Sequence, residues 1–305
     1  MNKPLALSIG IPHLNDQNAL ASCLAALAAQ QATAPAFEVI VVDNGSETLP
    51  TDVVARFDFA RLAEEQTPGP GPARNTAVSV MRSDLIAFID ADCIADPGWV
   101  AGIIAYFADH PETDVIGGDV RILPRNPSAL TAIEAYESIY GYRMQLYVER
   151  DHYTATCNMA LRRAMFEKAG GFGGIDIAED KDWGLRATAL GARIDYVQSI
   201  GIKTPARDDF GQLRRKWDRH IGHDFTEASG LLGWVRWCLR TVAVAASPIA
   251  ELPRVFKTDR VSGPRNRLLA LATLTRLRLF RARRMLGLAI FGNSKSLYQG
   301  WRQQP

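Results

Sequence analysis

Three nearly continuous apolar runs dominate the first hundred residues of the chain. They are LALSIGIP at residues 5–12, FEVIVVD at 37–43 and DLIAFID at 84–90. Apolar runs without polar alternation are typical of strands that are buried on both faces of a parallel sheet. A polar segment follows each run, which predicts that each strand ends in a turn or loop.

Apolar residues at helical spacing lie between these runs. In NDQNALASCLAALAAQQ, Leu20, Leu24 and Leu27 fall on one helical face. Asn15 or Asp16 is placed to cap the first turn of this helix. The loop TPGPGP leads into a second helix that starts with ARN, and DPGWVAGIIAYFADH predicts a third. This alternation predicts an α/β fold with a mostly parallel central sheet flanked by helices.

The pattern is looser after residue 113. A strand is expected at 114–122, an aromatic-rich helix at 128–150, a turn and short helix within 156–172, a helix at 178–190 that Gly191 stops, and a late strand at 192–200. Ligands bind such sheets beyond the carboxyl ends of the parallel strands, so residues that follow the early strands are the first candidates for a site.

Charge divides the 305-residue chain into two parts. The formal net charge is +2, but residues 231–305 contain 14 Lys/Arg and 2 Asp/Glu, a balance of +12 that leaves −10 for residues 1–230. The change near Gly230 predicts an acidic domain over 1–230 and a basic, helical C-terminal tail over 231–305.

Cysteine usage and hydropathy exclude several classes of protein. Cys23, Cys93, Cys157 and Cys238 are scattered, with no C-x-x-C spacing, which disfavours a zinc site or a disulfide framework. The N-terminal segment has only a short apolar run, so no secretory signal is expected. No segment reaches the roughly 18 uninterrupted apolar residues of a membrane span. We therefore expect a cytoplasmic protein.

Two aspartates, Asp90 and Asp92, directly follow the third apolar run and are separated by Ala91. Residues i and i+2 of an extended segment point the same way, so both carboxylates are expected to face one ligand. Adjacent carboxylates repel unless a cation lies near them, and their oxygens suit Mg²⁺ or Mn²⁺. The pair is a candidate metal site; the alternative is a solvated pair of turn residues.

The order of the motifs resembles the family-two inverting glycosyltransferases, which have a nucleotide-binding fold of the GT-A type. The resemblance covers roughly residues 5–225 and rests on IPHLND, VVDNGS, GPGPARN, the D-x-D segment and AED, in this order. It implies that residues 1–230 form a glycosyltransferase catalytic domain. It also implies a nucleotide-sugar donor, which we expect to be a UDP-sugar.

The resemblance assigns donor-site roles to the first three motifs. In that family, the first loop and the Asp after the second strand hold the nucleobase, which corresponds here to Pro12, Asn15 and Asp43. An Arg of the third motif lies against the nucleotide and corresponds to Arg74. His13 stands where many family members have Tyr or Phe.

Four further positions complete the donor site that the resemblance implies. Asp92 corresponds to the ligand of a divalent metal, while Asp90 contacts the metal or the ribose, with Ala91 between them on the donor. Asn158 corresponds to an Asn that lines the donor pocket, and Cys157 replaces the usual small residue before it.

The AED segment resembles the ED motif that opens a helix in this family. The resemblance implies that Asp180 accepts the proton of the acceptor hydroxyl, and that Glu179 positions it or contacts the acceptor. Amide dipoles in a first helical turn favour an ionised carboxylate, so we expect Asp180 to be able to accept a proton at neutral pH. The alternative is that both residues only cap the helix.

The basic tail has three open interpretations. Its segments at 231–257 and 265–292 mix Leu, Val and Trp with Arg, which is typical of helices that lie on an anionic membrane surface. Self-association, for example as a homodimer, and nucleic-acid binding are the alternatives, and the Leu and Trp content favours lipid. A protein at the inner face of the cytoplasmic membrane would suit a glycan or lipid-linked glycan as acceptor. His220 and His223 form an exposed pair or add a metal ligand.

Two other functions compete with glycosyl transfer. A nucleotidyltransferase would favour a Gly-rich first loop with Lys or Arg to hold a triphosphate, and IPHLNDQN has neither feature. A non-catalytic nucleotide-sugar-binding scaffold predicts loss of the D-x-D or ED motif, and both motifs are present.

Overall fold

The computed structural model describes residues 5–175, 177–226 and 230–292, without the side chains of residues 219, 220, 223, 224 and 226. The predictions for His220 and His223 therefore lie outside the described residues. The chain forms two compact units: Met1–Arg121 with Arg143–Pro205, and Ile122–Tyr142 with Ala206–Pro305.

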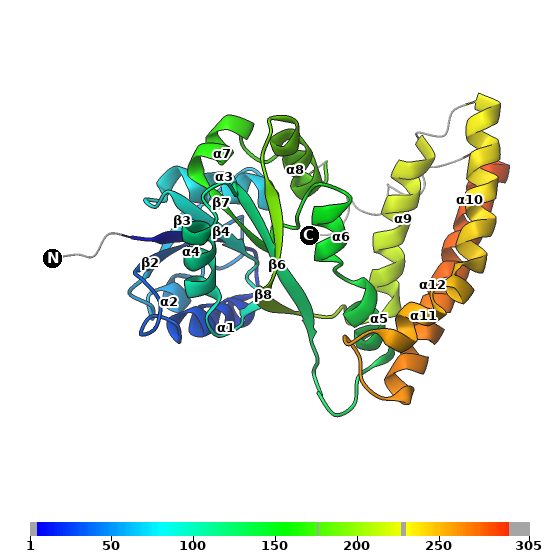
Figure 1. The fold of residues 1–305 in the computed structure, drawn as a ribbon, viewed down its shortest axis with the longest axis horizontal. Helices are drawn as coiled ribbons and strands as arrows, with labels where there is room; N and C mark the ends of the chain where they lie inside the picture. The colour runs from blue at the N-terminus through cyan, green and yellow to red at the C-terminus, as the bar shows by residue number, and fades with distance from the viewer. Residues whose placement is uncertain (1–4, 176, 227–229, 293–305) are drawn as a thin grey trace. The chain divides into compact units, whose positions relative to one another are not determined.

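The first unit is built on an eight-stranded sheet with the order β3-β2-β1-β4-β7-β6-β8-β5 among the described residues. The strands are β1 Leu7–His13, β2 Phe37–Asp43, β3 Ala60–Glu64, β4 Leu85–Ile89, β5 Ile94–Ala95, β6 Val115–Leu123, β7 Asn158–Arg162 and β8 Ile194–Pro205. Its helices are α1 Gln17–Ala28, α2 Thr51–Val54, α3 Pro70–Val80, α4 Trp99–Asp109, α6 Met144–Glu149, α7 Arg163–Ala169 and α8 Glu179–Ala189. The helices flank the sheet (Figure 1), which confirms the predicted fold class.

Strand direction determines where a site can form. β1 pairs in parallel with β2 and β4, and β2 pairs in parallel with β3. β7 is antiparallel to β4 and β6, and β5 is antiparallel to β8. His13 lies beside Asp43 in the register of β1 and β2, and Asp90 follows β4. The carboxyl ends of the parallel strands therefore bring these residues to one edge of the sheet.

Sequence patterns placed several elements correctly. Asp16 caps α1 by accepting a hydrogen bond from Ala19 N at 2.9 Å. α8 ends before Gly191, whose φ of +90° is the left-handed conformation expected just beyond a helix end.

Other elements differ from the sequence prediction. β3 has mixed exposure and was not predicted, because its residues lack a buried apolar run. β7 lies where a turn was expected, since its partners β4 and β6 are distant in sequence. The single helix expected at 128–150 is two helices, α5 Ala132–Tyr140 and α6, which belong to different units.

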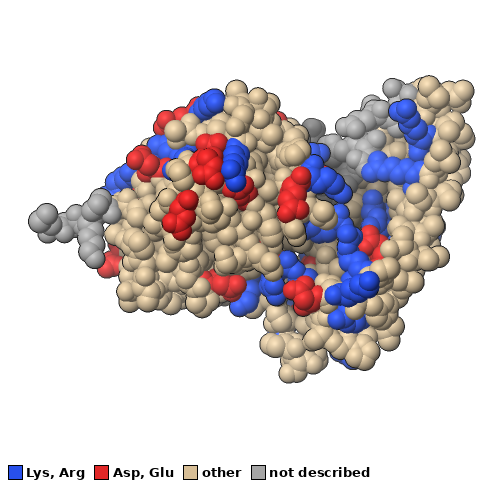
Figure 2. All heavy atoms as spheres, in the orientation of Figure 1, with Lys and Arg blue, Asp and Glu red and all other residues tan. Residues whose placement is uncertain are grey.

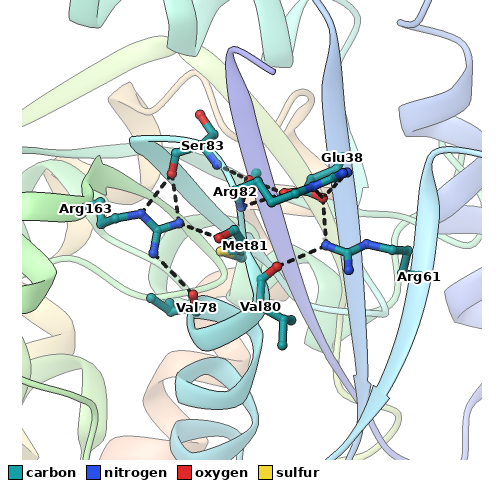
Figure 3. A network of polar contacts seen from close by, with 9 residues as sticks. Glu38, Arg61, Val78, Val80, Met81, Arg82, Ser83 and Arg163 are labelled. Atoms are coloured by element: carbon teal, nitrogen blue, oxygen red, sulfur yellow. Dashed lines mark hydrogen bonds and ion pairs between the residues drawn. The ribbon is translucent and has the colours of Figure 1, made fainter. Parts of the chain in front are cut away.

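Polar contacts hold the C-terminal end of α3 (Figure 3). Arg163 donates to the carbonyls of Met81 at 2.9 Å and Val78 at 3.3 Å. The buried Glu38 carboxylate accepts from Arg61 Nη2 and from Arg82 N, both at 2.8 Å. Burial opposes ionisation of Glu38, but hydrogen bonds from Arg82, Ser8 and Arg61 outweigh it and lower its pKa. The C-terminal end of α3 is thus anchored, opposite the Pro/Gly loop that leads into the helix.

The second unit consists of helices that pack around α12. They are α5, α9 Phe210–Thr226, α10 Gly230–Ala250, α11 Leu252–Lys257 and α12 Pro264–Phe291. Leu274 and Leu277 of α12 are buried against Tyr136 of α5 and Leu213 of α9. The guanidinium of Arg281 lies 3.6 Å from the Trp217 ring centre, a cation–π contact.

This packing differs from the tail predicted for residues 231–305. The compact unit begins at Ala206 and includes Ile122–Tyr142, so its limits differ from the boundary near Gly230 that charge predicts. Charge changes where α10 begins, whereas packing joins α9 and α5 to α12 because their apolar side chains share one core.

Candidate active site

Arg74 joins the two acidic motifs of the sequence. It lies in the second turn of α3 and is 3% exposed. Its Nη2 donates to Asp90 Oδ1 at 2.7 Å, and its Nη1 donates to Glu179 Oε1 at 3.0 Å. Burial opposes the charge on Arg74, but the carboxylates of Asp90 and Glu179 outweigh it and raise the pKa of Arg74. The D-x-D and ED segments therefore meet at one guanidinium.

The geometry of Asp90 and Asp92 differs from the extended segment that was predicted. Ala91 and Asp92 form a turn, and Cys93 N donates to the Asp90 carbonyl at 3.0 Å. Asp90 is part-buried and bonded to Arg74, whereas Asp92 is exposed. The pair is nevertheless coupled: partial loss of solvation and the negative charge of Asp90 raise the pKa of Asp92.

The donor atoms here fit a divalent ion that arrives with its substrate. Among the described residues, no group of three or more His, Cys, Asp and Glu side chains is arranged to hold a metal. Asp90 and Asp92 offer carboxylate oxygens, and a cation would relieve the repulsion that raises the pKa of Asp92. Mg²⁺ commonly takes one or two carboxylates and completes its shell with water and substrate phosphates.

Glu179 and Asp180 are the first two residues of α8. Burial and the neighbouring Glu179 charge raise the pKa of Asp180, an effect opposite in direction to that of the helix dipole. Asp180 Oδ1 also accepts from Lys181 N at 2.7 Å. A carboxylate with a raised pKa is a stronger proton acceptor than an ordinary aspartate.

Hydrogen bonds join the loops after β1 and β2, and they involve residues that were predicted to hold the nucleobase. Asp43 Oδ1 lies 3.0 Å from His13 Nδ1, and its Oδ2 accepts from Ser46 N at 2.9 Å. Burial opposes ionisation of Asp43, but hydrogen bonds from Ser46 and His13 outweigh it and lower its pKa. Asn15, with a φ of +59°, accepts from Glu47 N at 2.9 Å.

These contacts leave different surfaces of the two loops available. Asn15 is exposed and Pro12 is partly exposed at the end of β1, while Asp43 is 2% exposed. The Asp43 side chain is thus engaged in forming the loop. Pro12 and the Asn15 segment are the parts of this edge that remain accessible to a ligand.

Asn158 is fully engaged inside the first unit. Its Nδ2 donates to the carbonyls of Asp119 at 2.8 Å and Ile200 at 2.9 Å, and its Oδ1 accepts from Trp99 Nε1 at 2.8 Å. It is 2% exposed. These bonds connect β7 with β6, β8 and α4, so the structure gives this side chain a scaffold role beneath the edge.

Sequence reasoning missed two tyrosines beside the acidic pair. Tyr147 and Tyr153 are stacked with ring centres 5.1 Å apart, and both are partly exposed. Burial raises the pKa of each phenol, and the negative charge of Asp180 adds to this effect. Tyr153 also packs against Gly184 of α8, where an added Cβ would lie 2.4 Å from the Tyr153 Cβ. The aromatic content of 128–150 was the available signal for Tyr147.

Three cysteines lie under the D-x-D turn. Cys23, Cys93 and Cys157 are buried, and Cys23 Sγ lies 3.8 Å from the Asp90 carbonyl. Burial and the Asp90 charge raise the pKa of all three thiols. Cys238, in α10, has intermediate exposure. The four thiols are free.

Solved structures share this architecture. A mannosyltransferase from Pyrobaculum calidifontis, PcManGT, in complex with GDP-Man and Mn²⁺, superposes with a TM-score of 0.58 at 17% identity, over 94% of this chain and 88% of its own. TarS 1–349 of S. aureus in complex with UDP-GlcNAc gives 0.54 at 15% identity, over 97% and 91%. The fold is therefore that of a GT-A glycosyltransferase.

Sequence comparison identifies the family. Residues 8–170 match the family model described as Glycosyl transferase family 2. AglE of Haloferax volcanii is 29% identical over 216 residues, which cover 69% of this chain and 70% of AglE. Validoxylamine A glucosyltransferase of Streptomyces hygroscopicus subsp. limoneus is 33% identical over 283 residues, which cover 81% and 58%. The chain belongs to glycosyltransferase family 2, an inverting family.

Proposed function

We propose that the protein is a metal-dependent inverting transferase that moves a sugar from a UDP-sugar to a hydroxyl of a glycan or lipid-linked glycan. One observation carries the proposal: Arg74 bonds to Asp90 and Glu179, whose positions in the chain are far apart. Donor and acceptor chemistry must meet at one anomeric carbon, and this guanidinium joins the motifs proposed for each.

Asp92 and Asp90 are proposed to hold Mn²⁺ or Mg²⁺ together with the donor diphosphate. When bound, such an ion neutralises the charge that develops on the leaving diphosphate. Arg74 keeps Asp90 in place, so Asp92 is the carboxylate more available to the ion. Pro12, Asn15 and Ala91 are proposed to contact the donor, and Asp43 to shape the nucleobase loop.

Asp180 is proposed as the base. Its carboxylate accepts the proton of the acceptor hydroxyl while the acceptor oxygen bonds to the anomeric carbon and the bond from that carbon to the diphosphate breaks. Its raised pKa suits this task. Glu179, held by Arg74, positions Asp180, and Tyr147 and Tyr153 offer a stacked apolar surface for the acceptor.

The comparisons support a nucleotide-sugar donor but differ in the nucleotide and the sugar. The two neighbouring structures contain GDP-Man and UDP-GlcNAc, and one contains Mn²⁺. Nucleotide and sugar therefore require a direct test. The purified protein should be incubated with a panel of UDP- and GDP-sugars, with Mn²⁺, with Mg²⁺ and with chelator, while release of nucleoside diphosphate is measured.

Metal-dependent release from a UDP-sugar is the expected result. Asp180→Asn should remove it, and Asp182→Asn, a control in the same helical turn whose carboxylate pairs with Arg186, should retain it. Release that persists in chelator would overturn the metal dependence. Turnover of nucleoside triphosphates to pyrophosphate, without activity on any nucleotide-sugar, would instead establish the nucleotidyltransferase alternative.

A further inference from the structure

Helix α10 has two faces with contrasting surroundings. Trp237, Thr241, Val244 and Pro248 form its buried stripe, and Trp237 and Val244 pack in one cluster with Met285 of α12. The spacing of these residues repeats every three or four positions, so one side of the helix is seated on the rest of the second unit.

The opposite side of α10 is apolar and uncovered. Side chains at helical spacing on this side are Leu231, Leu232, Val235, Leu239, Val242 and Ile249; five of them are 66–77% exposed and Val235 is 40% exposed. The helix has 21 residues, which corresponds to a length of about 30 Å. A continuous apolar surface of this size on a protein marks a site of interaction.

Charge along α10 has a single sign. Arg236 and Arg240 are exposed beside the apolar stripe, and residues 230–250 contain no Asp or Glu. Figure 2 shows the outer edge of α10 largely without charged atoms. An apolar face bordered by arginine is the chemistry of a helix that lies in an anionic lipid interface.

We propose that the outer face of α10 binds the surface of an anionic lipid bilayer, with the helix axis in the plane of the membrane. Leu239, Val242 and Ile249 enter the boundary between headgroups and acyl chains. Arg236 and Arg240 contact lipid phosphates. Among the described residues, no helix is both long and apolar enough to cross a bilayer, so α10 lies on the surface.

A second copy of the chain fits this face less well than lipid does. Two α10 helices that paired through their outer faces would bring Arg236 and Arg240 near the same residues of the other copy. The helix contains no Asp or Glu that could form ion pairs across such an interface, and like charges at an interface are unfavourable.

Helix α12, which sequence reasoning also assigned to the surface, has both buried and exposed apolar positions. Its apolar positions Leu274, Leu277, Met285 and Leu288 are buried within the second unit. Arg281 is buried as well, and Arg284 pairs with Asp218 at 3.0 Å. Leu268, Leu279, Leu286 and Ile290 of α12 are 51–64% exposed, whereas five apolar side chains on the outer face of α10 are 66–77% exposed. The proposal therefore concerns α10, whose apolar face is the more exposed of the two.

Membrane binding by α10 would bring the enzyme to a lipid-linked acceptor, and only this link to the acceptor rests on the proposed function. Vesicle binding needs neither donor nor acceptor. If binding fails while UDP-sugar turnover persists, this inference alone fails, whereas binding without turnover leaves it standing and removes the proposed function.

The test is co-sedimentation of the full chain with vesicles of phosphatidylcholine, alone or mixed with phosphatidylglycerol. The protein should bind the anionic vesicles, and salt should weaken binding. The double variant Leu239→Gln/Val242→Gln should bind roughly tenfold more weakly or not at all. The control Leu190→Gln changes an exposed leucine at the end of α8 and should bind as the parent does.

The arginines give a second, independent variant. Arg236→Gln/Arg240→Gln should weaken binding to the anionic vesicles roughly tenfold and leave binding to neutral vesicles unchanged. Circular dichroism should show that both double variants are folded. Absence of vesicle binding by the parent, equal binding by the Leu239/Val242 variant, or a concentration-dependent dimer that this variant abolishes without any vesicle binding would each overturn the inference.

Discussion

Arg74 Nη2 lies 2.7 Å from Asp90 Oδ1, a contact that joins α3 to the residue after β4. The same guanidinium reaches Glu179 at the start of α8. Because the Glu38 and Arg163 contacts hold the far end of α3, the position of Arg74 is set by the scaffold before any ligand arrives. Preorganisation of this kind reduces the reorganisation that catalysis requires.

Replacing Arg74 by lysine should reduce kcat on the order of 100-fold, because a single ammonium cannot bond to both carboxylates with the geometry of a guanidinium. Steady-state kinetics with the nucleotide-sugar that the panel identifies as the donor would measure the loss. Arg56→Lys, on the exposed surface, is the control. A kcat within twofold of the parent would show that the bridge does not organise the site.

Asp92→Asn should abolish metal-dependent donor binding, since an amide is a weaker ligand for a hard cation than a carboxylate. Calorimetric titration of the nucleotide-sugar with and without Mn²⁺ would detect this. Asp84→Asn changes an exposed aspartate that precedes β4 and should leave the titration unchanged. Equal binding by both variants would exclude Asp92 as a ligand.

The pH dependence of kcat should report Asp180. The base acts when ionised, so kcat falls as pH falls through its pKa, which burial and Glu179 raise above the ordinary value of 3.8. Glu179→Gln removes a neighbouring negative charge, lowers the pKa of Asp180 and moves the acidic limb to lower pH. Asp180→Asn should retain donor binding and lose transfer. An acidic limb that stays in place in Glu179→Gln would argue against this coupling.

Glu38→Gln should lower the free energy of unfolding by about 1–3 kcal/mol at neutral pH. The pKa of Glu38 is lowered from 4.5 in the folded state. The ionised carboxylate therefore stabilises the fold fully above pH 4.5, and this contribution is lost as the pH falls through the lower pKa of the folded state. Urea unfolding across pH should show the difference between parent and variant shrinking on acidification. A difference that is constant with pH would contradict the ionic origin of this contribution.

Asn158→Ala should cost about 2–4 kcal/mol of stability, because it leaves two buried carbonyls and the Trp99 indole without their partner. Urea unfolding would measure this cost. The donor KM provides the contrast: a large rise in KM with unchanged stability would assign Asn158 to the donor pocket and not to the scaffold.

Local signals in the sequence were sufficient for the early part of the fold. Apolar runs and a capping Asp16 placed β1, β2, β4 and α1, since these elements are set by nearby residues. β7 depends on partners far along the chain, and the second unit joins α5 to helices that follow it by more than sixty residues. Such pairings leave no local periodicity to read.

Motifs in the sequence were sufficient to name candidate residues, but they did not predict which contacts these residues make. The sequence indicated Arg74 and Glu179 separately, and only the fold shows them bonded. It named Asp43 and Asn158 as donor contacts, and only the fold shows the bonds that these two side chains make within the protein. The pKa of Asp180 depends on burial, which a helix start in a sequence does not reveal.

The four thiols differ in accessibility, so one native cysteine can be labelled in preference to the others. Cys23, Cys93 and Cys157 are buried and protonated at neutral pH, so alkylating reagents reach them slowly in the native state. Cys238 is more accessible and lies on α10. A fluorophore attached to the native chain would therefore label this helix first, and its emission would follow the surroundings of α10 without any engineered cysteine.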